Sequence, residues 1–358
     1  MNRIKVLVVD DSAMMRKAVR QILETDPDIE VIGTARDGED ALRKDQELHP
    51  DVITLDINMP VMDGLTSLTL LLEQHPEVQV VMVSSLTQEG AITTFEAMEL
   101  GAFDYVAKPS GTVSSNLHVV GRELIAKVKG AAQQKRRRRR TAPGSTRPAP
   151  AVKKSVPIGE NRETSFRKVV VIGVSTGGPG TLMEILPQLP ANLDAALIVV
   201  QHMPPTFTAS FAKRLDDYCP LSFREAKAGD KLARGEGMVA PGGYHLVLKK
   251  NALRDDVMVR LTSQPEKSLF IPSVDVTMNS VLDLFGRRTV GVLLTGMGSD
   301  GAEAMVRIRQ AGGITIAEDR STAVVFGMPR EAIERGGAEI VAPSYNIAKE
   351  IVKAVNRI

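Results

Sequence analysis

Short apolar runs alternate with helical patterns along both halves of the chain, and this alternation constrains the fold more than any other feature. In the first half the runs are KVLVV, IEVIGTA, DVITLD, VQVVMVS and FDYVAK. In the second half the clearest are KVVVIGV, AALIVVQ, GMVAP and TVGVLLT. Such alternation is typical of a parallel sheet covered by helices on both faces. We predict the α/β class, with two doubly wound, mostly parallel-sheet domains.

A basic stretch of small residues separates the two halves. Residues 129–157 read KGAAQQKRRRRRTAPGSTRPAPAVKKSVP, with almost no large apolar side chain. Such a segment cannot bury enough surface to offset the entropy lost on ordering. We predict domains at residues 1–128 and 161–358, joined by a flexible basic linker at 129–160.

Composition and charge exclude several classes of protein. The chain has 358 residues, of which 43% are hydrophobic, and no apolar run reaches the roughly 18 residues needed to span a bilayer. Its start lacks the pattern of a secretion signal, and its single cysteine, Cys219, cannot form an intramolecular disulfide. We therefore expect a cytoplasmic protein that is not integral to a membrane. The net charge of +2 gives no reason to expect a nucleic-acid partner.

Charged and polar residues stand at the ends of the apolar runs in the first half. Asp10 and Asp11 follow the first run, Asp56 ends the third, Ser84 ends the fourth and Lys108 ends the fifth. The carboxyl ends of parallel strands meet at one edge, so these side chains should converge. Three carboxylates together call for a hard cation such as Mg²⁺. One carboxylate could then attack a phosphoryl group while the lysine neutralises its oxygens.

The motifs VVDDS, LDINMPVMDGL, VMVSS and YVAKPS occur in this order, and the first half resembles the response-regulator receiver domain, which is flavodoxin-like. This resemblance implies that Asp56 is the phosphoryl acceptor. It also implies a Mg²⁺ site and a set of phosphoryl-sensing residues, namely Asp10, Asp11, Asp56 and the backbone carbonyl of Asn58 for the metal, and Ser84, Tyr105 and Lys108 for sensing. Asn58 stands where we expect an acidic residue, which bears on the lifetime of the phosphoryl group.

The second half opens with VVVIGVSTGGPG, an apolar run that enters a glycine-rich turn at Ser175. A P-loop is excluded because no lysine follows the glycines. A dinucleotide site stays open, although Ser175 replaces the middle glycine of that fingerprint and the next run ends in VVQHMPP without an acidic residue. The turn also fits Gly-x-Ser-x-Gly, which exposes a nucleophilic serine, whereas the plainest alternative is a serine that caps the next helix.

A nucleophilic serine needs a base, and the base needs an orienting acid. His202 follows the next apolar run, and Asp300 follows the run TVGVLLT and a glycine turn. An aspartate in that position also suits a helix cap. Because each of the three residues follows a strand of one predicted sheet, we expect them to converge. Their order in the chain, Ser, His, Asp, differs from that of the α/β-hydrolases.

The motifs GVSTGGP, QHMPP, APGGYH, PSVDV and LLTGMGSDGA make the second half similar to the chemotaxis protein-glutamate methylesterase domain, which is Rossmann-like. With the receiver in front, the chain resembles the two-domain chemotaxis methylesterases. The resemblance implies phosphorylation-activated hydrolysis of glutamate methyl esters on chemoreceptor cytoplasmic helices, giving glutamate and methanol, and deamidation of glutamines. It implies methyl-accepting chemoreceptors as substrates, a sensor histidine kinase as phosphodonor and no cofactor for the esterase reaction.

The same resemblance assigns the residues of the second half. Ser175 is the nucleophile, His202 the general base and acid, and Asp300 the residue that orients His202. The remaining assignments are an oxyanion hole made by the backbone N–H groups of Thr176 and Met297, and site-shaping roles for His245 and Asp275. Ile271 stands where we expect a basic residue, a departure that bears on substrate preference.

The basic run from Lys135 to Arg140 raises one alternative function, which is nucleic-acid binding. A receiver that controls nucleic-acid binding could use these adjacent cations to contact phosphates. The second half carries no helix-turn-helix or other DNA-reading pattern, and a charge run in a linker is usually solvated.

Overall fold

The computed structural model describes residues 3–85, 87–108, 114–138, 168–250, 256–266 and 268–358. The chain forms two compact units, residues 1–146 and 147–358, and each unit contains a sheet of its own. Within the described ranges, no helix combines the length and apolar character needed to cross a membrane.

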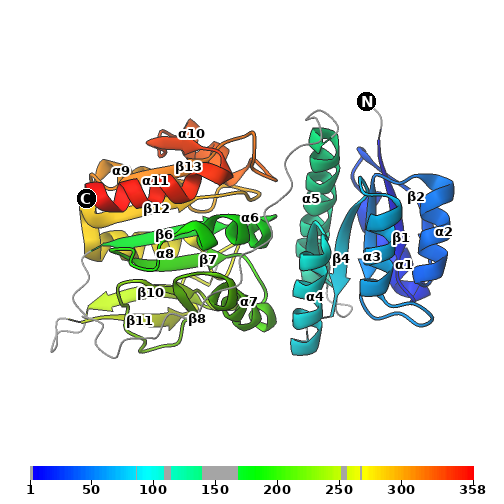
Figure 1. Ribbon diagram of the computed structural model, residues 1–358, viewed down its shortest axis with the longest axis horizontal. Helices are drawn as coiled ribbons and strands as arrows, with labels where there is room; N and C mark the ends of the chain where they lie inside the picture. Colours follow the sequence, from blue (N-terminus) through cyan, green and yellow to red (C-terminus); the bar gives the residue numbers. More distant parts are fainter. Residues whose placement is uncertain (1–2, 86, 109–113, 139–167, 251–255, 267) are drawn as a thin grey trace. The chain divides into compact units, whose positions relative to one another are not determined.

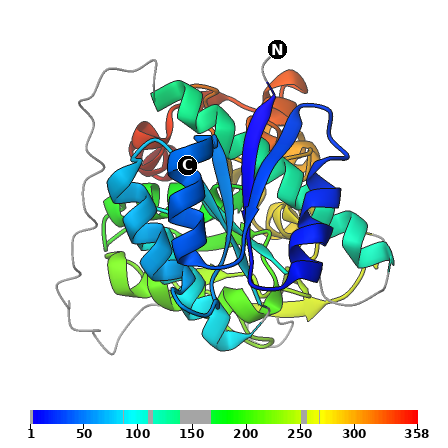
Figure 2. The ribbon, with the colours of Figure 1, turned by 90° about the vertical axis from the view of Figure 1, so that its right-hand side faces the viewer.

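In the first unit, a five-stranded parallel sheet lies between two layers of helices (Figure 1; Figure 2). Its strand order is β2-β1-β3-β4-β5, and all five predicted strands are found. The elements in chain order are β1 (Ile4–Val9), α1 (Ala13–Leu23), β2 (Ile29–Ala35), α2 (Gly38–Leu48), β3 (Val52–Asp56), α3 (Gly64–Gln74), β4 (Gln79–Ser84), α4 (Gln88–Leu100), β5 (Asp104–Ala107) and α5 (Ser114–Arg138).

Helix α1 shows how the sequence sets the elements around the carboxyl edge. Ser12 is its N-cap residue, and the Ser12 hydroxyl accepts a hydrogen bond from the Met15 N–H at 3.4 Å. Val19 and Leu23 are buried, whereas Met14 is 77% exposed, so only one stripe of the helix faces the sheet. The cap places the Asp10–Asp11 pair directly between the end of β1 and the start of the helix.

The expected start of the linker at residue 129 is wrong, because α5 continues to Arg138. Ala131 and Ala132 are buried, and Lys135 forms an ion pair with Asp51 at 3.3 Å. Small alanines pack closely and favour helices, so this stretch is ordered without large apolar side chains. Residues 139–160 of the predicted linker lie outside the described residues. Lys135, the first cation of the basic run, is therefore engaged within the first unit.

The second unit is built on a seven-stranded parallel sheet with the order β14-β13-β12-β6-β7-β9-β8. A separate antiparallel hairpin of β10 and β11 lies beside it. The elements in chain order are β6 (Val169–Val174), α6 (Gly178–Ile185), the 3₁₀ helix η1 (Leu186–Gln188), β7 (Ala196–Gln201), α7 (Pro205–Tyr218), β8 (Ser222–Glu225), β9 (Glu236–Val239), β10 (His245–Lys250), β11 (Val257–Thr262), α8 (Val274–Phe285), the 3₁₀ helix η2 (Gly286–Arg288), β12 (Thr289–Leu293), α9 (Ala302–Gln310), β13 (Ile314–Glu318), α10 (Met328–Glu334), β14 (Ile340–Ala342) and α11 (Ser344–Arg357).

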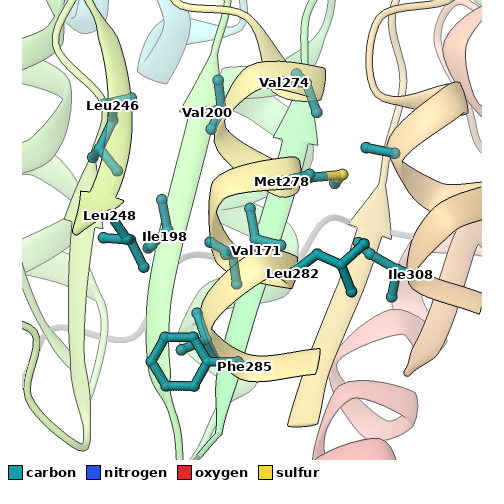
Figure 3. Packing of buried hydrophobic residues seen from close by; sticks show 14 of the residues in the cluster. Val171, Ile198, Val200, Leu246, Leu248, Val274, Met278, Leu282, Phe285 and Ile308 are labelled. Atoms are coloured by element: carbon teal, nitrogen blue, oxygen red, sulfur yellow. The ribbon is translucent and has the colours of Figure 1, made fainter. Parts of the chain in front are cut away.

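The four predicted strands of this half are β6, β7, β9 and β12, so the expected parallel-sheet architecture is confirmed. Helix α8 packs against this sheet through apolar side chains at helical spacing (Figure 3). The cluster includes Val274, Met278, Leu282 and Phe285 from the helix, and Val171, Ile198 and Val200 from β6 and β7. This packing brings the N-terminus of α8 to the carboxyl edge of the sheet, since a Cβ on Gly173 would lie only 2.2 Å from the Val274 side chain.

Candidate functional site

Ser175 and His202 follow two neighbouring parallel strands. β6 ends at Val174 and β7 ends at Gln201, and these two residues are paired in the sheet. The His202 N–H continues the pairing by donating to the Val174 carbonyl at 3.1 Å. Since adjacent strands lie about 4.8 Å apart, Ser175 and His202 are immediate neighbours at the carboxyl edge. This is the convergence predicted from the sequence.

Ser175 does not cap the helix that follows it. The N-cap residue of α6 is Gly177, with a φ of 76°, and no side chain caps this helix. Ser175 itself is partly exposed, in the turn between the buried strand β6 and the helix. The helix-cap alternative is therefore excluded, and the hydroxyl is presented at the edge of the sheet.

His202 donates a hydrogen bond to Asp300, with 2.8 Å between His202 Nε2 and Asp300 Oδ2. Burial alone would raise the pKa of Asp300, but the interaction with His202 and the N–H groups of Asp275 and Val274 outweigh it and lower that pKa. The carboxylate is thus ionised at neutral pH and can only accept, so Nε2 carries the proton. In the neutral ring the lone pair would then lie on Nδ1, which is buried and has no hydrogen-bond partner among the described residues.

Asp300 binds the N-terminus of α8 and does not cap α9. Its carboxylate accepts hydrogen bonds from Ser273 Oγ at 2.9 Å, the Val274 N–H at 2.7 Å and the Asp275 N–H at 3.0 Å. The N-cap residue of α9 is Gly301, whose φ of 89° and close approach to Val274 leave no room for a side chain. The first turn of α8 is therefore an anion site that fixes the acid beside His202.

The two predicted site-shaping residues lie around this helix terminus. Asp275 Oδ1 accepts a hydrogen bond from the Ala304 N–H at 2.8 Å, and burial together with the charge of Asp300 raises its pKa to about 6. His245 is fully buried, and its Nδ1 accepts the Ser273 N–H at 3.1 Å. Burial lowers the pKa of His245, which favours the neutral ring. His245 thus contacts the segment that holds Asp300, whereas Asp275 belongs to that segment and joins it to α9.

Three buried polar residues that the sequence reasoning missed hold the serine turn. Gln201 Nε2 donates to the carbonyls of Ser175 and His202, at 3.0 Å in each case. The Thr295 carbonyl accepts the Ser175 N–H at 2.9 Å, and Thr295 Oγ1 donates to the Thr176 carbonyl at 2.9 Å. Glu318 Oε2 in turn accepts the Thr295 N–H at 2.8 Å. A polar residue at the end of a buried strand, or within two residues after it, is the signal that could have found all three.

The segment after Thr295 approaches the serine closely. A Cβ on Gly296 would lie 2.8 Å from the Ser175 Cβ, so only glycine fits there. Met297, the next residue, is 37% exposed, and Thr176 directly follows the serine. The Ser175 N–H already donates to the Thr295 carbonyl, so it is not available to an oxyanion. The predicted oxyanion hole would therefore consist of the backbone N–H groups of Thr176 and Met297 without that of Ser175.

A second site lies at the carboxyl edge of the first unit. Carboxylate oxygens of Asp10, Asp11 and Asp56 all lie within 4.8 Å of one another. Lys108 Nζ is 2.7 Å from Asp56 Oδ2 and 3.1 Å from Asp10 Oδ2. Burial raises the pKa of Asp56, and the ammonium of Lys108 offsets this only in part. One ammonium faces three carboxylates, so this oxygen-rich set fits a divalent cation.

The other predicted residues of the first unit differ in their relation to this cluster. Asn58 is exposed two residues after Asp56, and its backbone N–H supports the Asp56 carboxylate. Ser84 is buried at the end of β4, where its hydroxyl contacts the Gly90 carbonyl at 3.2 Å. Tyr105 is buried on β5, with Lys127 Nζ 4.8 Å from its ring centroid. The structure therefore brings Lys108 to the carboxylates and directs the hydroxyl of Ser84 toward α4.

Both units match families of known proteins. Residues 170–351 match the CheB methylesterase family, and residues 6–117 match the response regulator receiver domain. A protein-glutamate methylesterase/protein-glutamine glutaminase of Syntrophomonas wolfei is 55% identical over 99% of this chain and 100% of its own, and one of Pyrococcus horikoshii is 46% identical over 99% and 94%. The crystal structure of the Thermotoga maritima CheB methylesterase catalytic domain is 43% identical, covering 52% of this chain and 97% of its own, with a TM-score of 0.50.

Proposed function

The chain belongs to the CheB methylesterase family and also carries a receiver domain, and from this premise we propose that Ser175, His202 and Asp300 hydrolyse glutamate methyl esters of chemoreceptors. The enzyme is a protein-glutamate methylesterase/protein-glutamine glutaminase, as are its full-length relatives. One observation carries the residue assignment. The hydrogen bond from His202 Nε2 to Asp300 leaves Nδ1 of the neutral ring with a lone pair, and His202 follows the strand that pairs with the one before Ser175.

In the first half of the reaction, Ser175 Oγ attacks the ester carbonyl while His202 Nδ1 takes the hydroxyl proton. The developing imidazolium is stabilised by Asp300, which holds the ring by Nε2. The negative oxygen of the tetrahedral intermediate would be bound by the N–H groups of Thr176 and Met297. Collapse expels the methoxy group, which takes the proton from Nδ1 and leaves as methanol. The serine is left acylated by the glutamyl side chain.

In the second half, water attacks the acyl enzyme and gives its proton to the same nitrogen. The second tetrahedral intermediate collapses to a glutamate side chain, and the proton returns to Ser175 Oγ. A glutamine side chain follows the same route with ammonia as the leaving group, which accounts for the glutaminase activity in the names of the relatives. None of these steps needs a cofactor.

For the first unit, we propose that Asp56 accepts a phosphoryl group from a sensor histidine kinase. Asp10, Asp11, Asp56 and the Asn58 carbonyl would hold Mg²⁺, which supplies charge neutralisation for phosphoryl transfer. Lys108 neutralises a phosphoryl oxygen, and its pKa supports this role. Burial works to lower that pKa, but Asp56 and Asp10 together raise it, so the ammonium stays charged. Phosphorylation would activate the esterase, which acts on cytoplasmic segments of the receptors.

The catalytic assignment is tested by methanol release from methylated receptor, with the full-length chain. We expect Ser175→Ala to remove the activity, whereas Ser222→Ala, on the sheet-edge strand β8, retains it. Circular dichroism of the variants checks that both fold. Methanol release by folded Ser175→Ala at the native rate would show that another residue is the nucleophile.

The regulatory assignment is tested with a small phosphodonor such as acetyl phosphate in the presence of Mg²⁺. The native chain should release methanol faster once the phosphodonor is added, and Asp56→Asn should not respond. Asp51→Asn is the matched control, because Asp51 pairs with Lys135 outside the carboxylate cluster and should leave the response intact. An equal response in Asp56→Asn would place the acceptor elsewhere.

A further inference from the structure

The ring of Phe270 lies flat against the imidazole of His202. The ring centroids are 4.1 Å apart and the ring planes differ by 13°. Phe270 is partly buried and stands four residues before Val274, in the segment that leads into α8. The same short segment therefore contacts both partners of the His202–Asp300 pair, with Phe270 on the imidazole and the first turn of α8 on the carboxylate.

The stack controls a motion that the hydrogen bond does not. The bond from Nε2 to Asp300 fixes one edge of the imidazole, but the ring can still tilt about the line joining these two atoms. A parallel aromatic ring at contact distance blocks that tilt on one face. The contact therefore limits the orientations that Nδ1 can take, and the proposed proton transfer requires an orientation in which Nδ1 faces Ser175.

The stack also favours the charged form of the ring. Two neutral aromatic rings prefer offset or edge-to-face contacts, whereas a cation is attracted to the negative face of an aromatic ring. In the proposed reaction the imidazolium forms when Nδ1 takes the serine proton. The contact with Phe270 thus becomes more favourable as positive charge develops on the imidazole. An interaction that is stronger in the transition state than in the ground state lowers the activation free energy.

We propose that Phe270 is a positioning residue for His202, which holds the imidazole in its catalytic orientation and stabilises the imidazolium. The proposal rests on the proposed function for its catalytic meaning, but the contact itself can be tested without any substrate. The proposal also concerns the neighbouring position, where Ile271 replaces the basic residue expected from the family resemblance. That residue contributes its carbonyl to the Gly243 N–H at 3.2 Å, and the side chain that meets the base is the one before it.

The test compares Phe270→Leu, which keeps an apolar cover without an aromatic face, with Phe270→Tyr, which keeps the face. We expect Phe270→Leu to lower kcat for methanol release about 5- to 30-fold and to change KM less than about twofold, because the loss falls on the charged intermediate. Phe270→Tyr should restore kcat to within about twofold of native. Leu269→Ala, at the exposed neighbouring position, is the matched control and should not reproduce the fall in kcat.

Nuclear magnetic resonance of the full-length chain supplies the second readout. The proton on His202 Nε2 should give a slowly exchanging downfield signal in the native protein and in Phe270→Tyr, and a broadened signal in Phe270→Leu. A sharp native-like signal in Phe270→Leu, or a native kcat, would overturn the proposal, as would an equal fall in kcat with Leu269→Ala. If the native chain released no methanol, the proposed function would fail, while the signal would still decide whether Phe270 holds the ring.

Discussion

The carboxylates of Asp275 and Asp300 are exchanged between two helices: Asp275 binds the N-terminus of α9, and Asp300 binds the N-terminus of α8. Asp275, in the first turn of α8, accepts the Ala304 N–H of α9 at 2.8 Å. Asp300, just before α9, accepts the Val274 and Asp275 N–H groups of α8 at 2.7 and 3.0 Å. Helix N-termini favour negative charge, so the exchange ties the two helices together and fixes the acid beside His202.

Asp275→Asn should remove a pH dependence of stability. Burial raises the pKa of Asp275 to about 6 from 3.8, so between these pH values the folded chain binds more protons than the unfolded chain. Its contribution to the free energy of unfolding therefore falls as the pH rises through this window, by up to about 3 kcal/mol. Asparagine keeps an acceptor for the Ala304 N–H without the charge.

Urea denaturation of both proteins at a series of pH values, followed by circular dichroism, measures this difference. Asp275→Asn should gain stability relative to the native chain as the pH rises from about 4 to about 7. A constant difference over that range would mean that Asp275 does not titrate there.

Asp300→Asn should lower kcat by about 10³- to 10⁴-fold, because an amide no longer holds His202 with its proton on Nε2. The substitution also removes the anion that three donors of the α8 N-terminus bind. Methanol release measures the loss, and circular dichroism checks the fold. Activity within tenfold of native would contradict the role of Asp300.

Thr295→Val should destabilise the turn at Ser175, because it removes the hydrogen bonds of the hydroxyl and keeps a side chain of nearly the same shape. The hydroxyl donates to the Thr176 carbonyl and accepts the Val325 N–H, both at 2.9 Å. Its loss should reduce the free energy of unfolding by about 1–3 kcal/mol and also lower kcat. Thr289→Val is the matched control on β12, because the Thr289 hydroxyl is buried without a hydrogen-bond partner in the described part of the chain. Equal losses for both variants would rule out the hydrogen bonds as the cause.

Lys108→Ala should strengthen Mg²⁺ binding by about tenfold, because the ammonium and the cation compete for the same carboxylates. Calorimetric titration at pH 8 and low salt measures the affinity. Lys5→Ala removes the same charge from an exposed position at the opposite end of β1 and should leave it nearly unchanged. Weaker binding in Lys108→Ala would show that the lysine helps to build the metal site.

The sequence by itself determined the α/β architecture and the residues that gather at each sheet edge. Apolar runs that alternate with helical patterns predict parallel strands, and parallel strands bring every residue that follows them to one edge. That rule was sufficient to place Ser175 beside His202, and Asp10 and Asp11 beside Asp56. The separate argument from composition failed at residues 129–138, which it assigned to a linker, because buried alanines order a helix there.

The tertiary structure alone decided how the side chains at those edges are used. Asp300 and Ser175 both fit the sequence pattern of a helix cap, yet glycines begin the adjoining helices and Asp300 binds the N-terminus of α8. The stack of Phe270 on His202 and the support of Ser175 by Thr295 join segments far apart in the chain. Local sequence sets strand and helix ends because the relevant hydrogen bonds are short-range, whereas these contacts depend on how α8 packs across the sheet.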